Sequence, residues 1–284
     1  MLLVTAFSWG MNYPVLKFIV TAWPPFTFRL LTGLAGAAFV ALIASARGER
    51  LWPRRGQWTR LIIASVLNLT SWMGFATASF YWLDGSEAAI IAYTMPVWAA
   101  MMAWPVLGER PTLPRLAGLA LGIGGVVVLM AGQLVNHPAG LLAAKLPGVA
   151  CILTTALMFA GGAVFTKRYP LQLPPFTNVA WQIFIGGLPL IGAVPLFDHW
   201  NPAGISPLGW AAFAYVAFIA LCVSYLAWFR ALALLPASVA ATGTLLVPVV
   251  GVGSSGLLLG EPLGPRQFIA LAMTLSGVTL ASRG

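Results

Sequence analysis

Long apolar stretches follow one another along the chain, separated by charged residues and by turns that contain Pro or Gly. A helix needs about 20 apolar residues to cross the hydrocarbon core of a bilayer, and these stretches reach that length. A membrane barrel would instead need strands of about ten residues with alternating polarity. The pattern therefore predicts ten transmembrane helices, over residues 2–20, 26–46, 60–82, 86–107, 113–132, 147–167, 175–197, 207–234, 238–259 and 265–282.

The composition excludes a soluble domain. Of the 284 residues, 60% are hydrophobic and 7% are charged, whereas a soluble domain is about 25% charged. Residues 1–16 lack the positive segment that opens a signal peptide, so we assign them to the first crossing. Cys151 and Cys222 fall within predicted helices and leave no disulfide framework. The expected fold class is an all-α polytopic membrane protein.

The Lys and Arg residues are distributed unevenly about the predicted helices. If residue 1 is cytoplasmic, eleven of the 15 lie on the inner side and four on the outer side. Because cytoplasmic loops are enriched in Lys and Arg, both termini are predicted to be cytoplasmic. The same bias accounts for the net charge of +9, so nucleic acid is not expected as a partner. On the outer side, we expect Lys17 and Arg29 to extend to the surface.

Two parts of the sequence resemble each other. Residues 1–33 align with 151–183, and residues 86–132 align without a gap with 238–284. The matches include Pro24-Pro25-Phe26-Thr27 with Pro174-Pro175-Phe176-Thr177, Pro96 with Pro248, and Leu107-Gly108-Glu109 with Leu259-Gly260-Glu261.

This repeat predicts two five-helix units, residues 1–133 and 147–284, joined by an outer linker at 134–146. Five is an odd number, so the second unit enters the bilayer from the opposite side to the first. Many transporters have such a 5+5 inverted-topology repeat, with the substrate site near the membrane mid-plane. A channel or a membrane enzyme does not require this symmetry.

No titratable residue is expected at mid-depth in the membrane. The carboxylates and histidines fall in loops or at helix ends: Asp84, Glu87, Asp198, Glu261, His137 and His199 on the outer side, and Glu49 and Glu109 on the inner side. Metal binding and acid–base catalysis therefore lack their residues. We predict no catalytic residue, no metal site and no cofactor. A proton antiporter built around a buried carboxylate is disfavoured for the same reason.

Aromatic and small polar side chains recur at helical spacing and are candidates for a cavity between the two units. The aromatic residues could instead serve packing, and interhelical hydrogen bonds could instead hold Asn12 and Asn68. The candidate substrate-binding residues are Trp9, Asn12, Tyr13, Asn68, Ser71, Trp72, Phe75, Ser79, Tyr93, Met95, Trp98, Phe159, Tyr225 and Trp228. Pro96 and Pro248 each remove a backbone hydrogen bond and are candidate hinges.

Such a neutral, aromatic cavity suits a zwitterionic or neutral solute with an apolar body. Aromatic rings attract an ammonium group, while hydroxyls, amides and helix dipoles can meet a carboxylate. Amino acids, above all apolar or aromatic ones, fit this description, and hydrophobic organic cations remain an alternative. Sugar phosphates fit less well, because no Lys or Arg pair is placed to neutralise a phosphate.

The whole chain resembles the drug/metabolite transporter superfamily. The shared features are the five-plus-five helices, Trp9-Gly10 and Lys17 in the first helix, and the prolines midway through helices four and nine. Gly108-Glu109-Arg110-Pro111 and Gly260-Glu261-Pro262 are similar to the EamA-type exporters, among which the YddG-like amino-acid exporters look nearest. Phe159-Ala160 stands where the first helix has Trp-Gly, so the two halves of the site are chemically unequal.

The resemblance implies a multi-pass exporter of small metabolites in the bacterial inner membrane, working by alternating access. Amino acids are the expected substrates, and facilitated transport is expected because no titratable group is buried. The alternatives are a multidrug or organic-cation exporter of the same fold and, outside this class, a membrane enzyme or a structural subunit. The expected partners are a small-molecule substrate and the lipid bilayer, with the chain acting as a monomer.

Overall fold

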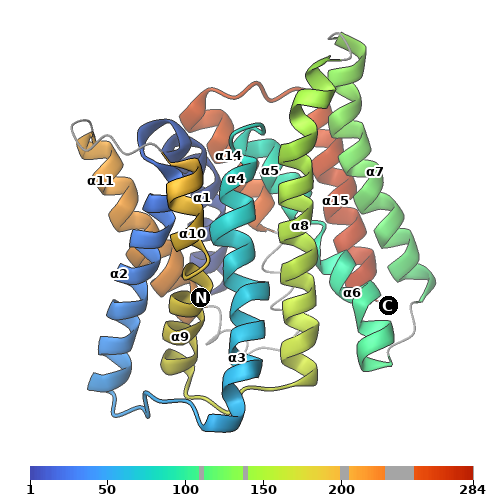
Figure 1. Ribbon diagram of the computed structural model, residues 1–284. Coiled ribbons are helices and arrows are strands. Elements are labelled where there is room, and N and C mark those ends of the chain that lie inside the picture. Colours follow the sequence, from blue (N-terminus) through green and yellow to red (C-terminus); the bar gives the residue numbers. More distant parts are fainter. Residues whose placement is uncertain (109–111, 137–139, 199–204, 228–245, 284) are drawn as a thin grey trace.

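The computed structural model describes residues 1–108, 112–136, 140–198, 205–227 and 246–283, and these residues form helices and no strands (Figure 1). The N-terminal part contains α1 (Leu2–Ala22), α2 (Pro25–Ala46), the short 3₁₀ helix η1 (Arg55–Gln57), α3 (Trp58–Ser65), η2 (Val66–Ala76), α4 (Thr77–Ser79), α5 (Gly85–Ala92), α6 (Met95–Leu107) and α7 (Leu113–Asn136). The C-terminal part contains α8 (Gly140–Arg168), α9 (Pro175–Gly187), α10 (Leu190–Phe197), α11 (Pro207–Ala214), η4 (Tyr215–Val223), α14 (Leu246–Leu259) and α15 (Pro265–Arg283). The all-helical class predicted from the sequence is therefore confirmed.

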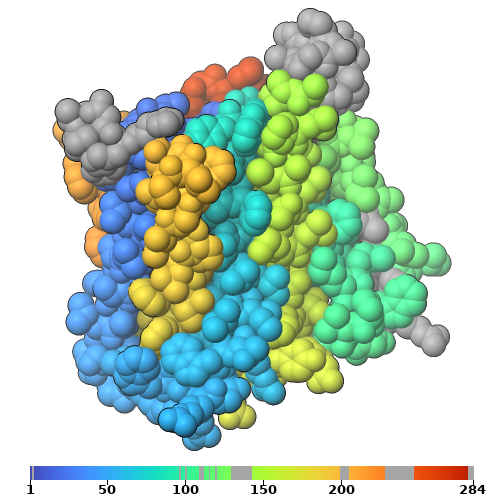
Figure 2. Space-filling view, in the orientation of Figure 1, coloured from blue at the N-terminus to red at the C-terminus, as the bar shows by residue number. Residues whose placement is uncertain are grey.

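Six helical stretches of the described residues are long and apolar enough to cross a membrane. They are Pro25–Ala46, Arg55–Ser79, Gly85–Leu107, Ala143–Arg168, Pro175–Phe197 and Pro207–Ala227. Helices α2, α9, α10, α3 and α8 form one continuous face of the molecule (Figure 2). Large apolar side chains such as Leu42, Leu157 and Ile191 are exposed on these helices, which indicates contact with lipid rather than water.

The first turns of α2 and α9 share one local design. Pro25 and Pro175 occupy the start of each helix, where a missing N–H group costs nothing and the fixed φ angle favours the helix. The sequence Pro-Pro-Phe-Thr recurs for this reason at both places. The links that follow α2 and α8 lie together at one end of the molecule (Figure 1), where Gln57 donates to the Gln172 carbonyl at 3.5 Å. Helices α2 and α9 therefore run in opposite directions.

The helices of the two parts pack in a reciprocal pattern. Helix α1 packs against α14, and its counterpart α8 packs against α6; α2 packs against α9, and α7 against α15. The largest buried cluster joins α1, α5 and α14 at the centre, with Tyr13, Ile90 and Val252 among its members. The core thus lies between the two parts of the chain instead of within each.

Aligned residues of the repeat make equivalent contacts across this core. Thr5 donates its hydroxyl to the Ser224 carbonyl at 3.4 Å, and Thr155, which aligns with Thr5, donates to the Ser71 carbonyl at 3.0 Å. Both contacts tie the first helix of one part to the third helix of the other.

Glycines allow the close approach of α7 and α15, which lie side by side in Figure 1. A Cβ atom on Gly277 would lie 2.6 Å from the Gly118 carbonyl oxygen, and one on Gly125 would lie 2.9 Å from that of Ala270. These four residues are two aligned pairs of the repeat.

Two long π-helical segments interrupt the α-helical pattern, η2 in the third helix and η4 in its counterpart. The residue after each segment satisfies a carbonyl five positions earlier: Thr77 donates to Trp72 at 3.5 Å and Ser224 to Ile219 at 2.9 Å. π-Helical turns are frequent at functional sites. Both segments contribute residues to the central cavity described below.

Candidate functional site

A cavity lies where helices from both parts of the chain meet. Its volume is about 60 Å³, which is room for a few water molecules at about 10–15 Å³ each. The lining residues are Trp9, Asn12, Tyr13 and Leu16 from α1, Arg29 from α2, Leu69 and Trp72 from η2, Tyr93 and Met95 at the break between α5 and α6, Phe159 from α8, Ala220 and Leu221 from η4, Tyr225 just after η4, and Val247 from α14.

Most of the predicted candidates line this cavity. They are Trp9, Asn12, Tyr13, Trp72, Tyr93, Met95, Phe159 and Tyr225. Sequence reasoning missed Arg29 and several aliphatic residues of the lining. Leu69, Ala220, Leu221 and Val247 carry no signal that separates them from the many other aliphatic residues of the membrane helices.

Edge-to-face aromatic contacts build the cavity wall across both parts of the chain. The Trp72 ring centroid lies 6.4 Å from that of Tyr13 and 6.1 Å from that of Phe159. The Trp9 and Tyr225 centroids lie 5.4 Å apart at 68°. Such pairs hold rings in fixed orientations, each contributing about 0.5–1.5 kcal/mol beyond their burial.

Two polar atoms of the lining on α1 have no partner among the described residues. The Asn12 Oδ1 and the Tyr13 hydroxyl are both buried and form no hydrogen bond there. A buried polar atom without a partner costs about 1–3 kcal/mol, so these atoms are suited to water or to a polar group of a ligand in the cavity.

Arg29 does not reach the outer surface, contrary to the prediction from the sequence. Its side chain lines the cavity, and the residue is only 3% exposed. The guanidinium Nε and Nη1 are buried and have no hydrogen-bond partner in the described part of the chain. The prediction of an uncharged cavity is therefore wrong. Helix α2 packs against η4, and Ala220 and Leu221 of η4 line the cavity together with Arg29.

Asn68 is held between helices and does not line the cavity, so that candidate is corrected. Its Nδ2 donates to Gln182 Oε1 at 3.2 Å, and Gln182 in turn donates to Asn178 Oδ1 at 2.9 Å. The amide also packs on Gly162 of α8, where a Cβ atom would meet Asn68. An interhelical hydrogen bond, the alternative interpretation of this residue, explains its place in the membrane.

Four other candidates also lie outside the cavity lining. Ser71 and Ser79 are buried and donate to carbonyls of their own helix, Leu67 at 2.7 Å and Ala76 at 2.7 Å. Trp98 donates to Thr94 Oγ1 at 3.0 Å. Phe75 is 41% exposed on the outside of the bundle. The wide turns of η2 rotate the helical stripe that the sequence suggested, which explains the positions of Ser71 and Phe75.

Three predicted residues remain: the candidate binding residue Trp228 and the two candidate hinges, Pro96 and Pro248. Trp228 lies outside the described residues. Pro96 stands in the first turn of α6, directly after the interruption at Tyr93 and Thr94, so the helix does break there. Pro248 is buried in the first turn of α14, and residues 228–245 before it lie outside the described part.

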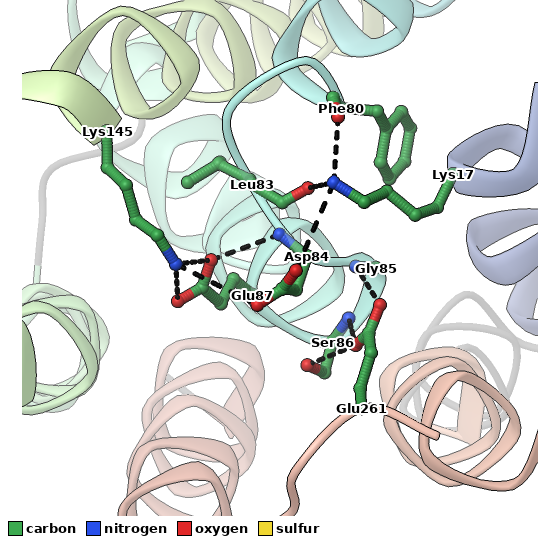
Figure 3. Close-up of polar contacts among 9 residues, drawn as sticks. All are labelled: Lys17, Phe80, Leu83, Asp84, Gly85, Ser86, Glu87, Lys145 and Glu261. Carbon is green, nitrogen blue, oxygen red and sulfur yellow. Dashed lines mark hydrogen bonds and ion pairs between the residues drawn. The ribbon is translucent and has the colours of Figure 1, made fainter. Parts of the chain in front are cut away.

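A polar cluster closes one end of the bundle around the first turn of α5 (Figure 3). Lys145 binds both oxygens of Glu87 at 2.8 Å, and Lys17 donates to the carbonyls of Phe80 and Leu83 at 2.9 and 2.8 Å. Glu261, which follows α14, accepts the N–H groups of Gly85 and Ser86 at 2.7 and 2.9 Å. This cluster joins the two parts at the helix ends and leaves its charges outside the cavity.

The described residues contain no group of three or more His, Cys, Asp or Glu side chains that could hold a metal ion. The cavity lining contains no carboxylate or imidazole among those residues either. The site can therefore bind a solute through aromatic faces, an amide, phenol groups and one guanidinium.

Comparison with known proteins finds transporters of similar sequence and a solved structure of similar fold. The sequence model of the EamA-like transporter family matches residues 1–131 and 146–283. The chain is 25% identical to the uncharacterized transporter YvbV of Bacillus subtilis, over 96% of this chain and 88% of that protein. It is 26% identical to a probable amino-acid metabolite efflux pump of Escherichia coli, over 97% and 91% of the two chains. A solved crystal structure shares the fold, with a TM-score of 0.69 and 19% identity over 98% of this chain and 94% of the other.

Proposed function

Because the chain belongs to the EamA-like transporter family, we propose that it exports small metabolites, most of all amino acids, across the bacterial inner membrane through the central cavity. The chain is a transporter and not an enzyme. It spans the membrane several times and carries a small-molecule substrate. The observation that carries the proposal is that the aromatic cavity receives residues from α1, η2, α8 and η4, helices of both halves.

The cavity chemistry supports amino acids as the substrate class. The rings of Trp9, Trp72 and Tyr225 can attract an ammonium group through their faces, and the free Asn12 Oδ1 can accept its hydrogen bonds. Apolar lining such as Leu16 and Val247 suits an apolar side chain. The name of the Escherichia coli relative, a probable amino-acid metabolite efflux pump, points to the same class.

The halves are proposed to be an inverted repeat of ten crossings, residues 1–133 and 147–284. The reciprocal packing of α1 on α14 and of α8 on α6 supports this arrangement. The opposite directions of α2 and α9 support it too, as do the equivalent contacts of Thr5 and Thr155. The two matches to the family, residues 1–131 and 146–283, divide the chain near the same linker.

Alternating access is the proposed mechanism, in which the halves exchange conformations and expose the cavity to each side in turn. A cavity of about 60 Å³ is too small for an amino acid until its walls separate. The break at Tyr93 and the wide turns of η2 and η4 lie in the lining, where a change of backbone geometry would widen it. Without a carboxylate or imidazole in the described lining, the transporter is proposed to follow the substrate gradient without proton coupling.

The end that carries the links after α2 and α8 is proposed to be cytoplasmic. Arg47, Arg50, Arg54 and Arg55 follow α2, and Lys167 and Arg168 end α8. At the other end, Lys17 and Lys145 pair with carboxylates. Cytoplasmic loops carry the excess of Lys and Arg, so both termini are proposed to be cytoplasmic. A monomer suffices for this mechanism.

The test is efflux from liposomes that contain the purified protein and are preloaded with labelled L-phenylalanine, L-leucine, glucose or methyl viologen. Efflux of the amino acids alone, above that of protein-free liposomes, is the expected result. Efflux of methyl viologen alone would instead identify an organic-cation exporter, and efflux of none of the four solutes would remove amino acids from the substrate class. Strong acceleration by an inward proton gradient would contradict facilitated transport.

A further inference from the structure

The central cavity contains one fixed positive charge. Arg29 is the fifth residue of α2, is 3% exposed, and lines the cavity beside the aromatic residues. A buried guanidinium needs hydrogen-bond acceptors and a counter-charge, because leaving a charge desolvated and unpaired is strongly unfavourable. Among the described residues, Nε and Nη1 form no hydrogen bond, and the ion pairs of the carboxylates do not include Arg29.

Carboxylates of the described residues are engaged elsewhere. Their ion pairs join Lys17 and Lys145 to Asp84 and Glu87 in the cluster at the helix ends. Asp198, near the start of α2, accepts the N–H groups of Phe26 and Thr27 with its two oxygens. Tyr225 also lines the cavity, but its neutral phenol supplies no negative charge. The counter-charge of Arg29 must therefore come from outside the described chain.

Arg29 is present in only one of the two repeated halves. The residues that start α2 and α9 recur as Pro-Pro-Phe-Thr, yet the position that aligns with Arg29 is Val179. Val179 is buried in an apolar cluster with Ile183. A charge needed to build the second helix of each half would be present in both. Its presence in one half alone, at the cavity, fits a role in binding.

We propose that Arg29 binds the carboxylate of the transported solute. This inference rests on the proposed function, because it takes the central cavity as the substrate site, and it narrows the substrates to compounds with a carboxylate. A guanidinium matches a carboxylate with two parallel N–H···O bonds. The Asn12 Oδ1 and the Tyr13 hydroxyl, both without partners among the described residues, then remain for the ammonium group of an amino acid. Organic cations are rejected by the charge of Arg29.

The first experiment compares pairs of solutes that differ only in the carboxylate, in liposomes with the wild-type protein. The probes are labelled L-phenylalanine with phenethylamine, and L-leucine with isoamylamine. We expect the amino acid of each pair to be transported at least about tenfold faster, the ratio typical of a lost charged hydrogen bond. Equal transport of acid and amine would overturn the role of Arg29 while leaving an amino-acid exporter in place. Transport of the amines alone would overturn both proposals.

The second experiment replaces the guanidinium. Arg29→Gln is expected to lower phenylalanine transport by about 10- to 100-fold and to raise the ratio of phenethylamine to phenylalanine transport. Arg29→Lys keeps the positive charge but cannot form the two parallel N–H···O bonds of a guanidinium, so its rate of phenylalanine transport should be intermediate. The matched control is Arg266→Gln, which removes an exposed cation near the start of α15 and should leave both rates unchanged. An unchanged ratio of phenethylamine to phenylalanine transport in Arg29→Gln would contradict the inference. If Arg29→Gln does not fold, the comparison of acids with amines in the wild-type protein decides the question.

Discussion

The carboxylate of Asp198 accepts the backbone N–H group of Thr27 at 2.5 Å and so caps the first turn of α2. The equivalent contact occurs at the other end of the molecule, where Glu49 accepts the N–H group of Thr177 at 3.0 Å and caps α9. Asp198 follows α10, which forms one span, Pro175–Phe197, with the helix α9 that Glu49 caps. Glu49 follows α2, the helix that Asp198 caps. Each half therefore closes the start of a helix in the other half.

Loss of either cap should destabilise the protein by a similar amount. Removing a capping side chain costs about 0.5–2 kcal/mol, and a carboxylate adds a favourable interaction with the helix dipole. Asp198→Ala and Glu49→Ala are each expected to lower the unfolding temperature in detergent, whereas Asp198→Asn keeps one acceptor oxygen and should lower it less. A large effect of one substitution without any effect of the other would contradict the equivalence of the two ends.

The buried ion pair in the cluster of Figure 3 gives a second prediction. The Glu87 side chain is 4% exposed, and Lys145 binds both of its oxygens at 2.8 Å. Lys145→Met removes the ammonium group that both oxygens of this buried carboxylate bind, which should cost about 3–5 kcal/mol in unfolding free energy. Adding Glu87→Gln to that variant removes the negative charge of the buried side chain and should recover part of the loss. A double variant less stable than Lys145→Met alone would show that the ion pair is not what the substitution disturbs.

The sequence predicted those features that depend on length and regular periodicity. Apolar stretches of membrane-spanning length become helices because backbone groups in lipid must bond within their own segment. On α1, a regular helix, the stripe of Trp9, Asn12 and Tyr13 does face the cavity. The repeat also identified residues with equivalent contacts, such as Gly125 and Gly277.

Other features depend on irregular helix geometry and on packing between helices, which the spacing of residues in the sequence does not predict. The π-helical turns of η2 hold more residues than α-helical turns, so Phe75 lies outside the bundle although it is spaced for one stripe with Trp72. The depth of Arg29 depends on how α2 packs against its neighbours. A cation near a helix end usually extends to the surface, so the sequence favoured the wrong environment.

Close packing of α7 on α15 gives a third prediction. In Gly277→Ala the new Cβ would lie 2.6 Å from the Gly118 carbonyl oxygen, so the two backbones must separate. Overpacking of this kind costs about 1–3 kcal/mol, measured as a lower unfolding temperature in detergent. Gly253→Ala in α14 is the control, because no atom lies within 4 Å of its Cβ position. Equal stability of the two variants would show that α7 and α15 do not meet in this way.

The proposed orientation predicts which side of the membrane exposes each loop. In a variant without Cys151 and Cys222, a single cysteine is introduced as Arg54→Cys or as Arg266→Cys, both at exposed positions. A membrane-impermeant thiol reagent added to intact cells should label the cysteine at position 266 and should label that at position 54 only after the cells are opened. The opposite labelling would reverse the orientation, and labelling of both in intact cells would contradict the placement of these residues at opposite ends.

Trp72 and Phe75 lie three residues apart in η2 and allow a matched test of the cavity. Trp72 lines the cavity and contacts Tyr13 and Phe159 edge-to-face, whereas Phe75 is 41% exposed. Trp72→Ala removes a ring that can hold the solute, so its transport rate should fall by about tenfold, the effect of losing one aromatic contact of about 1–2 kcal/mol. Phe75→Ala should leave the rate of efflux nearly unchanged. Both rates are measured in liposomes at equal amounts of folded protein, because Trp72→Ala also opens space in the core. If Phe75→Ala lowered the rate of efflux as much as Trp72→Ala, the aromatic residues would act on folding and not on solute binding. The cavity would then no longer be assigned as the substrate site.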